Sequence, residues 1–154
     1  MDIPLPTLDA TARLAGWLAP LLRRGDAILL EGPLGAGKTT FVRALLRAVG
    51  GDPALEVPSP SYTLVQTYDV DGLALHHFDL WRLDSPGGLA ELGWEEARGD
   101  VVLVEWPDRL GPLRPESALT ITLSPVGQTA RLARLRGWEA RLATAPPPEE
   151  AGFT

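Results

Sequence analysis

The clearest chemical signal in this chain of 154 residues is a short run of glycine, lysine and threonine. It extends from Gly32 to Thr39 and fits the pattern G-x-x-x-x-G-K-[ST], which is typical of loops that bind nucleotide phosphates. Glycines at both ends permit backbone angles that let successive N–H groups surround an anion. Lys38 adds a compact charge for the β- and γ-phosphates, and the Thr39 hydroxyl can bind Mg²⁺. We therefore expect a nucleotide to contact Gly32, Gly35, Ala36, Gly37, Lys38, Thr39 and Thr40.

The use of basic residues supports this interpretation independently. Lys38 is the only lysine, and the other 13 of the 14 basic residues are arginines. A planar guanidinium is too bulky for a point contact inside a tight phosphate loop. The single lysine therefore stands at the one position where arginine could not replace it.

Carboxylates at strand ends are candidates for holding the metal ion of such a site. Glu105 follows the apolar run Val101–Val104, which is the placement of an acid that binds Mg²⁺ through water. A solvated acid at a strand end is the simpler alternative. Glu31 also ends a strand, but that strand leads into the loop itself, so its side chain cannot easily reach round to the metal.

Asp79 is a further candidate for catalysis. Strand alternation would place His77 and Asp79 on one face, with Arg82 close behind. An acid there can order the attacking water or a water bound to the metal, although Asp79 and Arg82 could instead pair only to fix the loop. Two histidines without a third ligand argue against a zinc site. We predict Lys38, Asp79 and Glu105 as catalytic residues, and Thr39 and Glu105 as metal ligands.

Two further places could respond to the nucleotide or to a partner. Ser59, Ser61 and Thr63 follow the helix after the loop, where nucleotidases often carry a hydroxyl that senses the γ-phosphate; a plain strand entry explains them equally well. Trp106 adjoins Glu105 and could stack on a base, contact a partner or fill the core.

The elements that must position these residues alternate between helices and strands. The pattern predicts an α/β domain with a mixed sheet. One domain is expected over residues 1–144, followed by a disordered tail over 145–154. The predicted helices are 7–24, 39–49 and a short one within 88–98; the predicted strands are 27–30, 62–68, 73–78, 101–104, 119–123 and 130–135.

Composition excludes several classes of protein. The chain has no cysteine, which rules out disulfides, thiolate catalysis and iron–sulfur clusters. Its net charge of −6 argues against a surface that grips nucleic acid by itself. The N-terminus does not have the pattern of a secretory signal, and no apolar run approaches the roughly 20 residues that span a bilayer. A cytoplasmic protein without membrane contact is expected.

Four blocks in this order resemble the TsaE (YjeE) family, small ATPases of bacterial tRNA threonylcarbamoyladenosine synthesis. The blocks are residues 32–40, 58–65, 77–83 and 103–107, and the resemblance extends from about residue 8 to residue 135. The sequence departs from the family pattern at Trp81, where tyrosine is usual, and a hydroxyl bond would be lost there. The tail carries no family motif.

The resemblance implies an α/β fold of the P-loop NTPase type, with three layers and a mixed, mainly parallel central sheet. It implies ATP or ADP as ligand, with Mg²⁺ at Thr39 and Glu105. It also implies that Asp79 and Trp106 matter for activity or partner contact and that residues 59–63 form a switch-like loop. The expected partners are homologues of TsaB and TsaD, which modify adenosine 37 of tRNAs reading codons that begin with A; tRNA would be contacted only indirectly. Turnover would be slow alone and raised by these partners.

Two other functions fit the same motifs. A small-molecule kinase shares the phosphate loop, although the sequence lacks the arginine-rich lid segment of such enzymes. A nucleotide-gated adaptor, in which hydrolysis is incidental, is the second.

Overall fold

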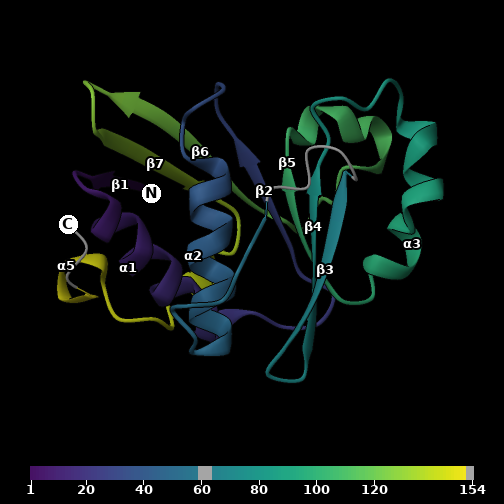
Figure 1. Ribbon diagram of the computed structural model, residues 1–154. Helices are drawn as coiled ribbons and strands as arrows, with labels where there is room; N and C mark the ends of the chain where they lie inside the picture. The colour runs from purple at the N-terminus through teal and green to yellow at the C-terminus, as the bar shows by residue number, and fades with distance from the viewer. Residues whose placement is uncertain (59–63, 152–154) are drawn as a thin grey trace.

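Two wholly apolar runs form neighbouring parallel strands in the middle of the sheet. These are β2 (Ala27–Glu31) and β5 (Val101–Glu105), with Leu29 opposite Val104. Both strands are buried on both faces, which explains their continuous apolar sequence. The structure is a computed structural model that describes residues 1–58 and 64–151, and Figure 1 shows these strands between helices on either side.

The described residues form a seven-stranded sheet of order β1-β7-β6-β2-β5-β4-β3. Its central pairs, β6–β2, β2–β5 and β5–β4, are parallel, whereas β1–β7, β7–β6 and β4–β3 at the edges are antiparallel. The predicted mixed sheet with a parallel centre is confirmed. The remaining strands are β1 (Asp2–Leu5), β3 (Val65–Val70), β4 (Leu73–Asp79), β6 (Leu119–Val126) and β7 (Ala130–Arg136).

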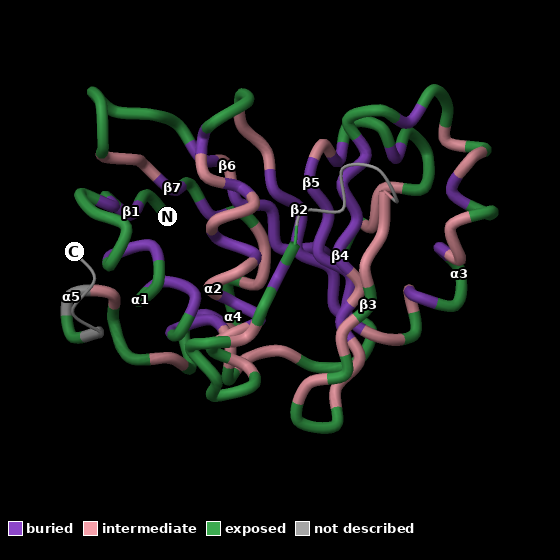
Figure 2. Tube along the Cα trace, viewed as in Figure 1, coloured by how far each residue is buried: buried purple, intermediate pink, exposed green. Residues whose placement is uncertain are grey.

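Helices cover both faces of the sheet and complete the three layers. On one face, α1 (Leu8–Leu18) packs against α2 (Lys38–Gly50), and both contribute to a core that includes alternate residues of the central strands. On the other face, η2 (Pro86–Leu92), α3 (Trp94–Ala97) and η3 (Pro107–Leu113) enclose a second, smaller core. The central strands are accordingly buried along their length in Figure 2.

Two predicted helices differ in extent from the structure. The first begins as expected, because the Thr7 hydroxyl accepts a bond from the N–H of Ala10, but α1 ends at Leu18. A short 3₁₀ turn, η1 (Ala19–Leu21), follows because Pro20 cannot continue an α-helix. The helix expected within residues 88–98 is divided into η2 and α3 at Gly93, whose φ of 76° ends a helix.

The sequence did not predict β1 or the short helix α4 (Glu139–Leu142). β1 has only four residues, one of which is Pro4, and it is an edge strand, where proline is tolerated. In the segment expected to be a tail, the indole N–H of Trp17 donates to the carbonyl of Pro146 at 2.7 Å, and a helical turn, α5 (Pro148–Ala151), follows.

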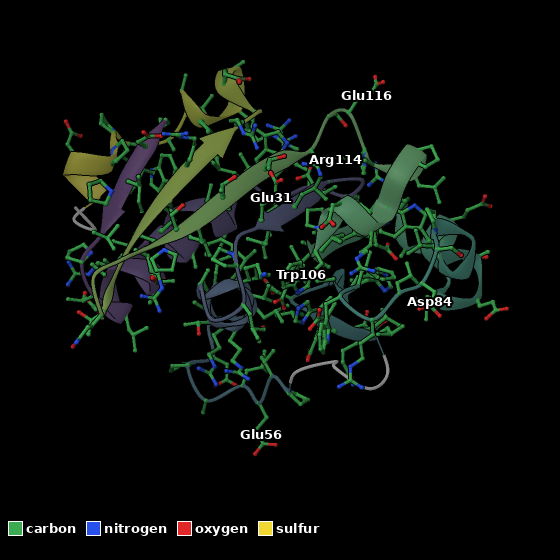
Figure 3. All side chains as sticks on the ribbon, turned by 90° about the horizontal axis from the view of Figure 1, so that it is seen from above. Glu31, Glu56, Asp84, Trp106, Arg114 and Glu116 are labelled. Atoms are coloured by element: carbon green, nitrogen blue, oxygen red, sulfur yellow. The ribbon has the colours of Figure 1, made fainter. Side chains whose placement is uncertain are left out.

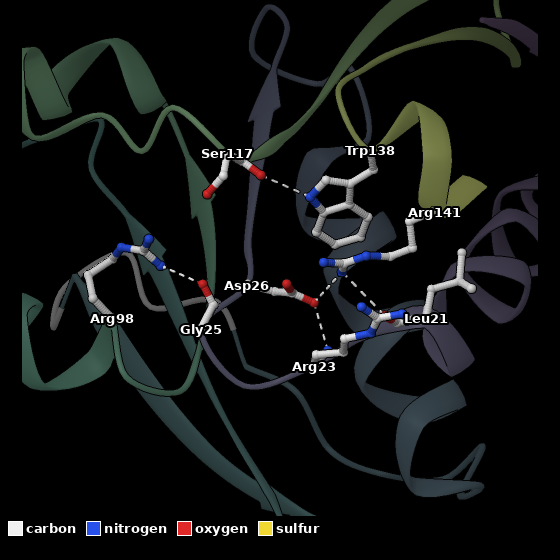
Figure 4. A network of polar contacts seen from close by, with 8 residues as sticks. All are labelled: Leu21, Arg23, Gly25, Asp26, Arg98, Ser117, Trp138 and Arg141. Atoms are coloured by element: carbon white, nitrogen blue, oxygen red, sulfur yellow. Dashed lines mark hydrogen bonds and ion pairs between the residues drawn. The ribbon is translucent and has the colours of Figure 1, made fainter. Parts of the chain in front are cut away.

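A polar network attaches α4 to the start of β2 (Figure 4). The carboxylate of Asp26 accepts bonds from Arg141 Nη1 and the Arg23 N–H, both at 2.6 Å. The Arg141 guanidinium lies 4.1 Å from the ring centroid of Trp138, whose indole N–H donates to the carbonyl of Ser117 at 3.0 Å. The chain after β7 is thereby attached to the residues that precede β2 and β6.

None of the helices in the part of the chain that the structure describes has the length and apolar character needed to cross a membrane.

Candidate functional site

The predicted phosphate loop connects β2 to α2 as a tight turn. Gly35 and Gly37 have φ of 80° and 103°, values in the left-handed region that favours glycine. Inside the loop, the N–H of Ala36 donates to the carbonyl of Pro33 at 3.1 Å. The 13-residue α2 begins at Lys38, so N–H groups without an intrahelical partner and the positive end of the helix lie at the loop. This arrangement can hold an anion.

Lys38 is held inside the site. Its Nζ donates to the carbonyl of Gly32 at 2.5 Å and lies 3.5 Å from the ring centroid of Trp106. The side chain is buried, and this burial lowers the pKa of Lys38, against the opposing effect of Glu105 and Asp79. Trp106 has a left-handed backbone, with φ of 59° and ψ of 55°, and is half-buried. The single lysine of the chain therefore has an aromatic face and a carbonyl as its partners.

Thr39 and Glu105, the two predicted metal ligands, lie in direct contact. The Thr39 hydroxyl is 2.8 Å from Oε1 and 2.9 Å from Oε2 of Glu105. Asp79 stands opposite Glu105 in the parallel pairing of β4 with β5, so that two carboxyl groups lie at the same edge of the sheet. Thus the structure brings together the predicted residues from three separate segments of the chain.

Asp79 is buried and incompletely hydrogen-bonded. It is 6% exposed, and its Oδ1 has no hydrogen-bond partner among the described residues. Burial and the nearby Glu105 raise the pKa of Asp79, while a bond from the backbone of Trp81 acts in the opposite direction. Such a carboxyl keeps its proton to higher pH than an exposed aspartate does.

The sequence did not assign His77 a role, although alternation placed it on the same face as Asp79. Its Nε2 lies 2.6 Å from Oε2 of Glu105, and the side chain is 0% exposed. A carboxylate only accepts hydrogen bonds, so the imidazole must donate from Nε2. Its Nδ1 is buried without a partner among residues 1–58 and 64–151. His77 therefore orients the carboxylate that Thr39 also contacts.

Arg131 of β7 is a second residue that the sequence did not single out. It shares with the loop a cavity of about 370 Å³, whose lining also includes Leu8 and Thr11 of α1 and Leu123 of β6. Of the residues proposed from the sequence, those that line this cavity are Gly35, Ala36, Gly37, Lys38, Thr39, Thr40, Asp79, Glu105 and Trp106. Gly32 is not among the described residues that line it. Ser59, Ser61 and Thr63 lie outside the described residues.

The oxygen ligands present fit Mg²⁺ better than a transition metal. Thr39 and Glu105 offer a hydroxyl and a carboxylate, which are hard donors. Within the described residues there is no group of three or more histidine, aspartate, glutamate or cysteine side chains placed to hold a metal ion. A magnesium ion bound mainly by phosphates and water needs only one or two ligands from the protein.

Glu31, the other strand-end carboxylate, lies apart from this cluster as the sequence predicted. Its Oε1 accepts a bond from Arg136 at 2.8 Å and lies 3.5 Å from Arg114 Nη2. Figure 3 shows Glu31 beside Arg114, and Glu31 pairs with Thr122 of β6. Glu31 is therefore engaged by arginines rather than directed at the phosphate loop.

Comparison with known proteins identifies the family of the chain. Residues 5–133 match the family described as "Threonylcarbamoyl adenosine biosynthesis protein TsaE". A relative named "tRNA threonylcarbamoyladenosine biosynthesis protein TsaE" from Rickettsia felis is 36% identical over 128 residues, which cover 82% of this chain and 74% of that protein. The protein of the same name from Aquifex aeolicus is 38% identical over 112 residues, which cover 72% and 80%.

A solved structure has the same fold. The crystal structure of Bacillus subtilis YdiB superposes with a TM-score of 0.73 at 26% sequence identity, covering 94% of this chain and 89% of that one. The family match spans more than half of the chain, and the relatives are matched over most of their own length. The chain therefore belongs to the TsaE family of tRNA threonylcarbamoyladenosine biosynthesis.

Proposed function

We propose that the chain binds ATP together with Mg²⁺ at the Gly32–Thr39 loop and hydrolyses it to ADP and phosphate. The observation that carries the proposal is the contact between Thr39 and Glu105, beside the loop that holds Lys38. The Thr39 hydroxyl lies 2.8 and 2.9 Å from the two carboxylate oxygens of Glu105. A glycine-rich turn with a merely structural role would need neither a buried lysine nor a buried carboxylate at this place.

The residues of the site have complementary tasks in this reaction. Loop N–H groups and Lys38 bind the phosphates, and Thr39 and Glu105 are the residues that would hold the metal ion. Mg²⁺ offsets negative charge on the transferred phosphoryl group. Asp79, whose pKa is raised, is suited to orient the attacking water or accept its proton. Catalysis of this kind rests mainly on positioning and charge.

Turnover by the chain alone is proposed to be slow. Arg131 is the single arginine among the described residues that line the cavity, and its guanidinium is bonded to loop carbonyls. An arginine that supplies charge to the transition state accelerates phosphoryl transfer strongly when it is present. We therefore propose that homologues of TsaB and TsaD raise the rate, and that tRNA is contacted through them because this chain has a net charge of −6.

A first experiment tests the reaction on the protein alone. Phosphate release from ATP is measured with and without Mg²⁺, in the absence of any acceptor, for the native chain and for Lys38→Ala. Magnesium-dependent release that is lost in the variant supports the ATPase. Release that requires an added small-molecule hydroxyl compound would instead indicate a kinase.

A second experiment tests the partners. Modified adenosine is scored over many turnovers with TsaB, TsaD and tRNA, using native protein, Lys38→Ala and Glu105→Gln. Loss of modification with both variants supports hydrolysis as the useful step. Full support by a Glu105→Gln protein that binds ATP without hydrolysing it would favour a nucleotide-gated adaptor, and equal ATPase rates with and without partners would contradict the proposed stimulation.

A further inference from the structure

The β6–β7 hairpin packs directly against the phosphate loop. A Cβ atom on Gly32, which has φ of 144°, would collide with the carbonyl oxygen of Leu123 in β6. Ala36, four residues further on, is fully buried. The loop thus lies directly against a hairpin that is about ninety residues away in the sequence.

Arg131, at the beginning of β7, bonds the loop backbone through several donors of its guanidinium. Its Nε donates to the carbonyl of Ala36 at 2.8 Å, and its Nη2 donates to the carbonyl of Gly35 at 3.2 Å. Its Nη1 donates to the carbonyl of Ala130 on its own strand at 2.9 Å. One planar group therefore connects two successive loop carbonyls to β7.

These bonds determine which way the N–H groups of the loop point. The Gly35 carbonyl and the Ala36 N–H belong to one peptide unit, and the Ala36 carbonyl and the Gly37 N–H belong to the next. In a trans peptide the two groups point in opposite directions, so a bond to the carbonyl fixes the N–H on the other side. The Ala36 N–H is used by Pro33 within the turn, which leaves the Gly37 N–H directed away from Arg131.

Hydrogen bonds from Arg131 should matter most for a loop that is rich in glycine. Glycine loses more conformational freedom on ordering than any other residue. Gly35 carries one of the bonded carbonyls, and Gly37 directly follows the other. A loop that is already ordered avoids that loss when its ligand binds, and its affinity is higher.

We propose that Arg131 is a positioning residue of the phosphate site. It holds the peptide units of Gly35 and Ala36, so that the loop is ordered before nucleotide binds. This inference rests on the proposed function, since it concerns the same loop. The role depends on the fork of the guanidinium. It differs from a direct contact of positive charge with phosphate, which a lysine could also make.

The experiment compares Arg131→Ala, Arg131→Lys and native protein by calorimetric titration with ATP and with inorganic tripolyphosphate, both with Mg²⁺. Arg134→Ala is the matched control, because it removes the same charge from the same strand, where Arg134 forms an exposed ion pair with Asp2 at 2.9 Å. Thermal melts monitor folding. If the alanine variant melts early, the lysine variant, which keeps the stem and the charge, decides the question.

We expect the dissociation constants for ATP and tripolyphosphate to rise about tenfold or more in both Arg131 variants, as for the loss of a charge-assisted bond. The KM for ATP rises by a larger factor than kcat falls, because the bound nucleotide itself helps to order the loop. Amide exchange in residues 32–40 of the nucleotide-free protein becomes faster in both variants, and Arg134→Ala behaves like the native chain.

Native affinity in Arg131→Lys would overturn the inference, because charge alone would then suffice. Native affinity in Arg131→Ala, or unchanged amide exchange in the loop, would overturn it as well. A native protein that binds neither ATP nor tripolyphosphate would refute the proposed function itself, so the two failures are distinguishable.

Discussion

We expect the substitution His77→Leu to slow ATP hydrolysis by removing a hydrogen bond that Glu105 accepts. His77 Nε2 is 2.6 Å from Glu105 Oε2, and the two side chains are 0% and 3% exposed. Without His77, the described contacts leave Thr39 as the remaining side-chain partner of this carboxylate. The carboxylate would then turn more freely at the proposed metal site.

The size of the effect follows from the kind of bond. A hydrogen bond to a charged group contributes about 1.5–3 kcal/mol. If all of this free energy is lost from the stabilisation of the transition state, the rate falls about 10- to 150-fold. The melting temperature should fall as well, because the buried Glu105 carboxylate loses a hydrogen-bond partner, although leucine fills a similar volume.

The assay is magnesium-dependent phosphate release over a range of Mg²⁺ and ATP concentrations. We expect kcat to fall and half-saturation by Mg²⁺ to rise, with a smaller change in the KM for ATP. His77→Gln, whose amide can reach the same oxygen, should restore most of the rate. His76→Gln is the matched control, because the neighbouring His76 bonds Thr67 and Asp100 near the surface. A leucine variant with native kcat and Mg²⁺ dependence, or an equal loss in His76→Gln, would refute the reasoning.

The other predictions concern stability. The pKa of Asp79 is raised from 3.8, so the folded protein keeps this proton to higher pH than the unfolded chain, and stability falls as pH rises from the unfolded pKa to the folded pKa. Asp79→Asn should remove that loss, which is about 1.4 kcal/mol for each pH unit between the two pKa values, in chemical denaturation of the ligand-free protein. Asp26→Ala should cost about 3 kcal/mol, because it leaves the Arg141 cation largely buried without its carboxylate. Gly32→Ala should lower the melting temperature and abolish ATP binding, because the new methyl group meets the backbone of Leu123.

Each of these has an outcome that would contradict it. A stability difference between native protein and Asp79→Asn that is constant across pH would exclude the titration argument. For Asp26, a denaturation midpoint like that of the native chain would show that the network in Figure 4 is unimportant for folding. Gly16→Ala is the control for Gly32: its Cβ meets no atom within 4 Å inside α1, and it should stabilise by about 0.5–1 kcal/mol. Tight ATP binding by Gly32→Ala would refute the packing argument.

The centre of the fold was predictable because its signals are local. Strands buried on both faces need continuous apolar sequence, and β2 and β5 have it. By contrast, β1 is defined by its pairing with β7, with Asp2 opposite Arg134, and four residues containing a proline carry no strand signal of their own. The division of the helix expected within 88–98 depends on Gly93, which is compatible with either a helix interior or its end.

In the site, too, the sequence predicted only the residues that have a local signal. Lys38 and Thr39 belong to a contiguous motif, and Glu105 follows an apolar strand, so each has a signal in its own neighbourhood. His77 and Arg131 act through partners that are 28 and 95 residues away in the sequence. Nothing local separates Arg131 from the other arginines, and only the packing of the hairpin on the loop reveals its contacts.

The packing of β7 on the phosphate loop has a consequence for how the protein is made. The loop and Arg131 are separated by 95 residues, so a ribosome adding about 5–20 residues per second produces them roughly 5–20 s apart. During that interval the nascent chain has the whole phosphate motif but lacks the strand that orders it. Tight nucleotide binding would then arise late in synthesis, and ATP would stabilise molecules whose last sheet strand has already docked.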